Sequence, residues 1–177
     1  ASNIVNFLTG AEVVNNNFAD YGLTQKVDLP VTLAANGLEI TYHEAFLYKA
    51  TSTEAKEIQK RFEITSYYRG TDILLLKVTM KNTSNKVIQH SYDDVERKIR
   101  VSFNTNAEMT SAISTNANLD QKDGDFLNVF LLQPQNSLTG YVVFIKKHNH
   151  KDVPIEYLSF MTVHREKSKI QNIAKKE

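Results

Sequence analysis

Two histidines and an aspartate in the last third of the chain have the side chains and the spacing of a metal site. His148 and His150 are two residues apart, and Asp152 follows at the same interval. On an extended segment such residues point to one side, where imidazole nitrogens and a carboxylate can share a cation. Residues 146–151 also contain three lysines, which repel a dication. An exposed hairpin loop is therefore the favoured interpretation, and a metal-binding or small-ligand loop is the alternative.

Carboxylates cluster at two further places. Asp120, Asp123 and Asp125 surround Gly124 as calcium ligands could, but they lack the regular spacing and the terminal glutamate of an EF-hand. The acidic run 93–96 could supply an acid–base pair, which requires a cleft and two separated pKa values that the sequence does not indicate. A solvated turn and a loop between strands are the favoured interpretations. Because no nucleophile motif accompanies them, we expect neither catalysis nor a cofactor.

Aromatic and basic side chains at 67–69 are typical of a contact surface. Tyr67, Tyr68 and Arg69 are consecutive, and tyrosine and arginine are enriched at protein interfaces. Tyrosine is also common on strands, and that is the favoured interpretation here. Together with Asp120 and Asp123, these three residues form the predicted binding surface.

Composition excludes several classes of protein. The chain has 177 residues, with 21 lysines and arginines against 20 aspartates and glutamates, for a net charge of +1. This balance gives no reason to expect nucleic acid as a partner. Cysteine is absent, which excludes disulfides and thiolate chemistry. No apolar run reaches the ~18 residues of a membrane-spanning helix, and the sequence specifies no oligomeric state.

Most of the elements that must position these residues are predicted to be short strands. The run 73–80 alternates strongly and predicts a buried strand. Another alternating run begins near residue 26, and Pro30 places it at a sheet edge because proline lacks a backbone donor. Asn36-Gly37 predicts a tight hairpin. Residues 51–54 fit a capping box and predict a short helix, and residues 62–68 read as a further strand.

Roughly eight or nine short strands separated by turn signals predict an all-β, antiparallel sandwich with a short helical insertion. Residues 1–25 are a leader or linker that docks through a helical turn, and residues 26–164 are the sandwich. Residues 165–177 form a basic tail, for which a disordered segment or a weakly docked helix is expected.

Three segments resemble a known family when they are taken in order. Residues 73–88 run from a hydrophobic strand into Lys-Asn-Thr and a polar turn. Residues 132–144 contain a proline turn, then glycine and an apolar strand that ends in phenylalanine, and residues 155–163 resemble a closing strand. Together they resemble the telokin-like, immunoglobulin-like domain of secreted and lipid-anchored Gram-positive proteins. The mycobacterial immunoprotective extracellular antigens are similar.

The resemblance implies an immunoglobulin-like Greek-key sandwich, an extracellular or cell-envelope location and no established enzymatic activity. It implies turn roles for Asn82, Pro134 and Gly140. A lipid-anchored member carries a cysteine at its mature N-terminus, so an anchor here would have to lie upstream of Ala1.

The sequence and the resemblance together lead us to expect a non-enzymatic binding or scaffold module. It would recognise a protein or an envelope component through two long loops, residues 51–70 and 104–125, because recognition usually lies on loops of a rigid scaffold. Deleting residues 110–123 is then expected to leave the fold intact but to weaken partner binding.

Overall fold

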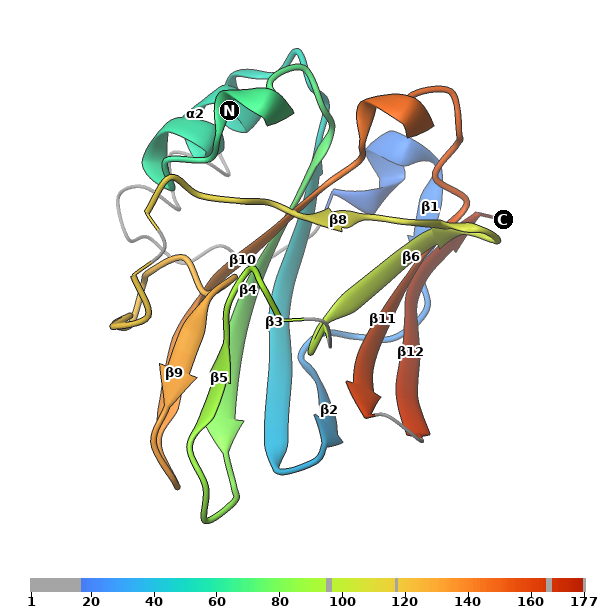
Figure 1. Cartoon of the computed structure of the whole chain (residues 1–177). Helices are drawn as coiled ribbons and strands as arrows, with labels where there is room; N and C mark the ends of the chain where they lie inside the picture. The colour runs from blue at the N-terminus through green and yellow to red at the C-terminus, as the bar shows by residue number, and fades with distance from the viewer. Residues whose placement is uncertain (1–16, 95–96, 117, 165–166, 177) are drawn as a thin grey trace.

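Two antiparallel sheets that face each other make up most of the protein (Figure 1). The computed structural model describes residues 17–94, 97–116, 118–164 and 167–176, and the side chains of these residues outside 163–170. The all-β architecture and the short helical insertion predicted from the sequence are confirmed. The immunoglobulin-like connectivity stays a prediction.

The first sheet joins the two ends of the described chain. Its five strands, in spatial order, are β1 (Leu23–Gln25), β12 (Lys167–Lys176), β11 (Tyr157–His164), β6 (Arg100–Asn104) and β7 (Ala107–Glu108). The second sheet has the order β2 (Val31–Ala35), β3 (Leu38–Tyr48), β4 (Ile73–Asn82), β10 (Ser137–Ile145) and β8 (Thr110–Ser111). A two-stranded ribbon is formed by β5 (Ile88–His90) and β9 (Phe130–Leu132).

Four short helices complete the described structure. They are η1 (Phe18–Tyr21), α2 (Thr53–Arg61), η2 (Ser66–Tyr68) and η3 (His148–His150). The docked helical turn expected in the leader is confirmed by η1, because Phe18 is buried in the core. The expected capping box is shifted by one residue: the cap of α2 is Ser52, whose hydroxyl accepts the Ala55 amide at 3.1 Å.

The main core lies between the two sheets. Its clearest contact joins Tyr42 of β3 and Phe160 of β11, whose ring centroids are 4.5 Å apart. Phe130 and Leu132 of the ribbon belong to the same core. Each of these four side chains is almost fully removed from water, which is the main source of stability in a domain of this size.

A second apolar cluster lies on the opposite face of the β3–β4–β10 sheet, beneath α2. There Phe46 and Leu75 pack with Ile58 of the helix. A β-bulge at His43 makes this possible because it shifts the alternation of β3 by one residue. The bulge thus turns Phe46 away from the main core.

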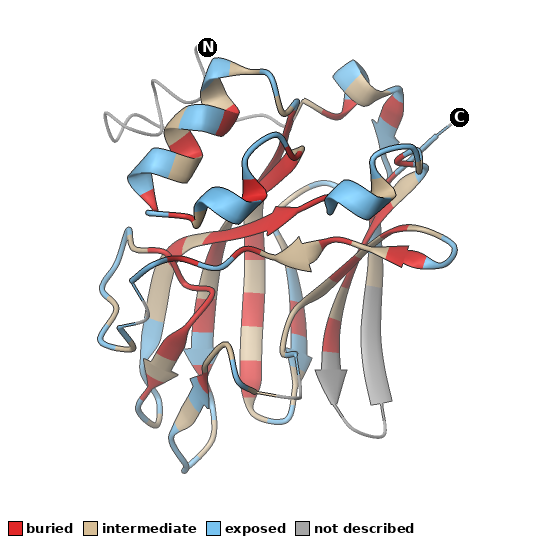
Figure 2. Cartoon of the chain, turned by 45° about the horizontal axis from the view of Figure 1, so that its top comes forward, coloured by how far each residue is buried: buried red, intermediate tan, exposed pale blue. Residues whose placement is uncertain are grey.

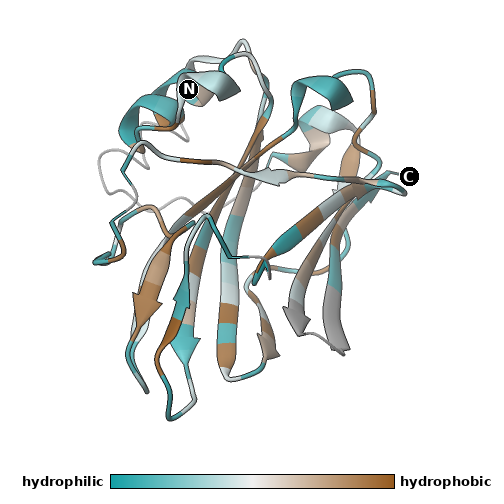
Figure 3. Ribbon diagram, viewed as in Figure 1, coloured by the Kyte–Doolittle hydropathy of each residue, from teal (hydrophilic) through white to brown (hydrophobic). Residues whose placement is uncertain are grey.

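The exposed side of α2 is polar, whereas β3 alternates between hydrophobic and more polar residues only in its first half, before the bulge (Figure 3). Figure 2 shows buried residues on one side of α2 and exposed residues on the other. Helix and sheet therefore follow the periodicities of 3.6 and 2 that a half-buried element requires.

Local signals predicted the first hairpin correctly. β2 lies at the edge of its sheet as predicted, but it begins at Val31 and not near residue 26, so Pro30 precedes the strand and is not part of it. Asn36 and Gly37 form the two-residue turn between Ala35 and Leu38, with φ angles of +56° and +84°. Positive φ at both positions is what a type I′ hairpin turn requires.

Two predicted elements are wrong. Residues 167–176 do not form a helix or a free tail: they are β12, which pairs with both β1 and β11. A bulge opposite Leu158 and Ser159 lets the adjacent residues Ile173 and Ala174 both be buried. Two apolar neighbours break the alternation typical of a strand, so the sequence of this segment looks like one face of a helix. Residues 62–68 are likewise not a strand, because they end in η2.

The turn role expected of Asn82 is confirmed, since its amide nitrogen donates to the Lys86 carbonyl at 2.6 Å and its oxygen accepts from the Ser84 amide at 2.9 Å. Pro134 lies in the turn between β9 and β10. Gly140 is not in a turn: it lies within β10, where residues 125–127 cross closely over it.

We predict that Gly140→Ala destabilises the protein by roughly 1–3 kcal/mol, as overpacking does. A methyl group there would overlap the Asp125 carbonyl oxygen and come within 2.9 Å of Leu127 Cγ. Urea unfolding measures the change, with the exposed Ser137→Ala on the same strand as a control that should stay within about 0.5 kcal/mol of wild type. Equal stability of both variants would contradict the close crossing.

Candidate functional site

The two long loops predicted to carry recognition are bonded to each other. The Thr65 amide donates to the Ile113 carbonyl at 2.9 Å, and the Thr115 amide donates to the Glu63 carbonyl at 2.8 Å. The buried Ser114 hydroxyl also donates to the Phe62 carbonyl at 2.8 Å. Segments about fifty residues apart thus form one surface, which we call the joined-loop surface, comprising residues 51–70 and 113–115.

Tyr67 is the most prominent side chain of this surface. It is 73% exposed, the highest value among the exposed large hydrophobic residues that the structure describes. Its ring meets Tyr68 edge to face at a centroid distance of 5.2 Å and His148 at 6.4 Å. Tyr68 itself is buried, so it supports Tyr67 from below instead of forming the outer contact predicted from the sequence.

A broad hollow of about 880 Å³ lies beside the segment that carries Tyr67, since Ser66 and Arg69 both line it. It is lined by three cationic side chains, Lys56 and Lys60 of α2 and Arg69 after η2, against a single acidic one, Glu63. Hydroxyl groups of Thr51 and other residues complete the wall. This composition offers positive charge and hydrogen-bond donors to an acidic partner.

A smaller hollow of about 270 Å³ lies next to the same segment, because Tyr68 is one of the residues that line it. Tyr92, Arg97 and Lys147 are further parts of its wall. The Tyr92 hydroxyl accepts the Ser114 amide at 2.9 Å, which connects this hollow to the joined-loop surface. Its cations outnumber its acidic residue, Glu108, which forms an ion pair with Arg100.

The predicted residues Asp120 and Asp123 lie apart from these hollows, since neither lines them. Both are exposed. The Asp123 carboxylate accepts the Thr139 amide of β10 at 2.9 Å, and the Asp125 carboxylate accepts the Lys122 amide at 2.8 Å. These carboxylates therefore hold the loop in place against the sheet.

The expectation that residues 110–123 can be deleted without harm to the fold is wrong. They include β8, which pairs with β10, and the buried Ala112. Asn128 secures this segment: its amide nitrogen donates to the Ala112 and Val143 carbonyls at 3.1 and 2.8 Å, and its oxygen accepts the Val143 amide at 2.9 Å. Removing the segment would take away the pairing of β8 with β10 and the Ala112 carbonyl that the buried Asn128 amide contacts.

The histidine loop is not extended as the metal hypothesis required. His148 and His150 lie in η3, and their rings contact different partners, Tyr67 at 6.4 Å and Phe103 at 5.9 Å. Burial lowers the pKa of Lys146, and the Asp72 and Asp152 carboxylates act in the opposite direction. Within the described ranges, no three histidine, aspartate or glutamate side chains come together as a group that could hold a metal ion.

The sequence did not predict that His90 is buried, as it is beside Phe130. Its Nδ1 lies 3.3 Å from Asp94 Oδ2, although the two atoms are not aligned as in a hydrogen bond. Burial lowers the pKa of His90 to about 4, with Lys98 and Arg97 acting in the same direction and Asp94 opposing them. Only its position on β5, where the ring turns inward, reveals this environment.

Comparisons with known proteins do not assign this chain to a family. No family model matches this chain, and no curated protein matches it. The resemblance to telokin-like domains therefore stays a prediction. In the described part of the chain, no helix is long and apolar enough to cross a membrane.

Some solved structures are similar in shape. A protein of unknown function from Listeria monocytogenes EGD-e is 8% identical over 87% of each chain, with a TM-score of 0.48. The yjhA protein of Bacillus subtilis is 9% identical over 75% of this chain and 78% of its own, with a TM-score of 0.44. The predicted lipoprotein ycdA of Bacillus subtilis is 11% identical over 85% of this chain and 40% of its own, with a TM-score of 0.46. Likenesses at this level transfer neither activity nor partner.

We predict that His90 makes the protein lose stability between about pH 6.5 and pH 4. In this window the unfolded chain takes up a proton at His90 that the folded chain refuses, which favours unfolding by up to the order of 2–3 kcal/mol. Urea unfolding across this range should show a smaller loss for His90→Gln than for wild type. The exposed His148→Gln serves as the control and should follow wild type; identical curves for all three would contradict the assignment.

Proposed function

We propose that this protein is a non-enzymatic binding module that contacts an acidic protein partner through the joined-loop surface. The observation that carries the proposal is the hydrogen bonding of two distant loops beneath the exposed Tyr67, with cation-lined hollows beside it. A surface held in this way loses little conformational entropy when a partner binds.

The composition of the surface supports a protein partner. Tyr67 offers a large, amphipathic and exposed side chain, and Arg69 follows two residues later in the chain. Central tyrosine and arginine side chains often supply most of the binding energy of an interface. Lys56, Lys60 and Arg97 surround them with positive charge, which steers an acidic partner toward the site.

The finer parts of the proposal concern family and location. We infer an immunoglobulin-like, telokin-like domain that works outside the cytoplasm, at the cell envelope or in the medium. The two-sheet antiparallel architecture is compatible with this family, and the resemblance of residues 73–88, 132–144 and 155–163 supports it. Fractionation of the native cells, with the intact mass of the protein's N-terminus, tests the location. Recovery of an unprocessed protein from the cytosol would contradict it.

We predict that Arg69→Glu and Tyr67→Ala each weaken partner binding at least about tenfold, the effect typical of a central interface residue. The partner is first trapped by a photo-crosslinking residue placed at position 67 and is identified by mass spectrometry. Affinities of the purified pair are then measured at low and high salt, and the Arg69 contribution should shrink as salt screens it.

The matched control is Lys81→Glu, the same reversal of charge at an exposed residue of β4, which should leave affinity unchanged. Equal losses for Lys81→Glu and Arg69→Glu would mean that only net charge matters, which contradicts a defined site. Crosslinking to an anionic envelope polymer instead of a protein would keep the surface but overturn the assigned partner.

A further inference from the structure

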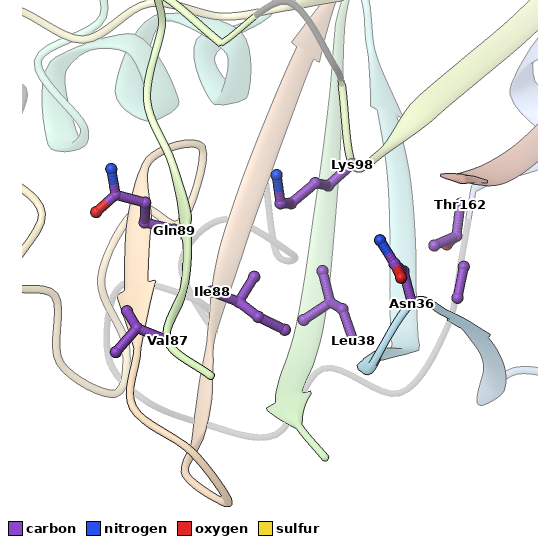
Figure 4. Close-up of a pocket in the computed structure, with 8 residues that line it drawn as sticks. Asn36, Leu38, Val87, Ile88, Gln89, Lys98 and Thr162 are labelled. Carbon is purple, nitrogen blue, oxygen red and sulfur yellow. The ribbon is translucent and has the colours of Figure 1, made fainter. Parts of the chain in front are cut away.

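A separate pocket of about 290 Å³ lies between the β2–β3 hairpin, β5 and the far end of β11 (Figure 4). It shares no lining residue with the two hollows beside the joined-loop surface. Its volume is close to the lower end of the range typical of small-molecule sites. Any function of this pocket is therefore independent of the function proposed above.

One part of the pocket is apolar. Leu38 of β3 is buried, Ile88 of β5 is half-buried, and Val87 is 48% exposed although it is a hydrophobic residue. Ala35 at the end of β2 extends this lining. Together these side chains offer a surface on which a short hydrocarbon group would be removed from water, which is favourable by roughly 0.8 kcal/mol for each CH₂ group.

The polar part of the pocket carries a single charge. Lys98 is the one ionisable side chain among the described residues that line it, and no acidic side chain opposes it there. In Figure 4 the side chain of Lys98 extends above Leu38 and Ile88, and the amide of Asn36 lies nearby. A ligand with one negative charge is the complement of this arrangement.

A buried hydroxyl group without a partner lies at the edge of the pocket. Thr162 is 1% exposed and lines the pocket, yet its Oγ1 has no hydrogen-bond partner among the described residues. The Tyr42 hydroxyl is also buried: burial raises its pKa, and the Thr162 hydroxyl beside it acts in the opposite direction, although the two groups are not aligned in a hydrogen bond of good geometry. Buried hydroxyls are nearly always satisfied, because an unpaired one costs about 1–3 kcal/mol. A ligand that supplies an acceptor removes this cost.

We propose that this pocket binds a small amphipathic carboxylate, a molecule with one negative charge and a short apolar body. The carboxylate pairs with the Lys98 ammonium and accepts a hydrogen bond from the Thr162 hydroxyl. The apolar body lies on Leu38, Ile88 and Val87. Charge, hydrogen bonding and hydrophobic contact thus each have a named source in the chain.

Octanoate is a suitable probe, and its binding to the full chain is followed by two-dimensional NMR and calorimetry. We expect saturable binding, with the largest shifts at Ile88, Lys98 and Thr162. Octanol, which lacks the charge, and octylammonium, which reverses it, should each bind at least about tenfold more weakly. Absence of saturable octanoate binding tighter than about 10 mM, or equal binding of all three probes, would overturn the proposal.

Two substitutions distinguish specific binding at this pocket from nonspecific binding elsewhere on the surface. Lys98→Met keeps the apolar stem and removes the charge, so octanoate affinity should fall at least about tenfold. Lys86→Met is the matched control: Lys86 is an exposed lysine beside Val87 that does not line the pocket, and affinity should not change. Equal effects of both substitutions would contradict the assigned role of Lys98.

Thr162→Val tests the role of the Thr162 hydroxyl, because it should change stability and octanoate affinity in opposite directions. The variant has nearly the same shape, so the ligand-free protein should melt at a higher temperature than wild type because the unsatisfied hydroxyl is gone. Octanoate should bind the variant more weakly. A lower melting temperature for the free variant would mean that the hydroxyl already has a partner, and the proposed role of Thr162 would be wrong.

Discussion

The rest of the structure depends on a sheet that is apolar on both faces at one end only. In β4, Ile73, Leu74, Leu75 and Leu76 are all buried, so each face of this end needs its own cover. The opposing sheet covers one face, and α2 with its flanking residues covers the other. Further along, where Lys77 and Thr79 occupy the outer face, no second cover is needed. The β3 bulge at His43 matches this change, because it turns Phe46 and Tyr48 toward the helix.

The proposed contact surface follows from the need to hold that cover in place. A nine-residue helix is marginal by itself, and it is held by its buried face and by the hydrogen bonds of residues 62–65 to residues 113–115. Asn128 in turn holds the second segment against β10 through a buried amide. The turn that bears Tyr67 is therefore rigid for structural reasons, and a rigid turn with an exposed aromatic residue suits recognition.

The carboxylate pocket has a different physical origin. It lies where the β2–β3 hairpin, the β5–β9 ribbon and the end of β11 meet without filling the space between them. Tyr42 and Thr162 bring hydroxyls into the core from opposite sheets at this place.

The sequence by itself determined the features whose causes lie within a few residues. Asn36-Gly37 produced the hairpin because both accept positive φ, and residues 53–61 formed a helix because their apolar spacing suits one. Only the tertiary structure decided that residues 167–176 are a strand, that Gly140 is a crossing point, and that His90 is buried. Each of these depends on a partner far away in the chain: the two strands beside β12, the carbonyl of Asp125 above Gly140, and Phe130 beside His90. Because such contacts are set by pairing register and packing, and not by local backbone preference, no short stretch of sequence contains them.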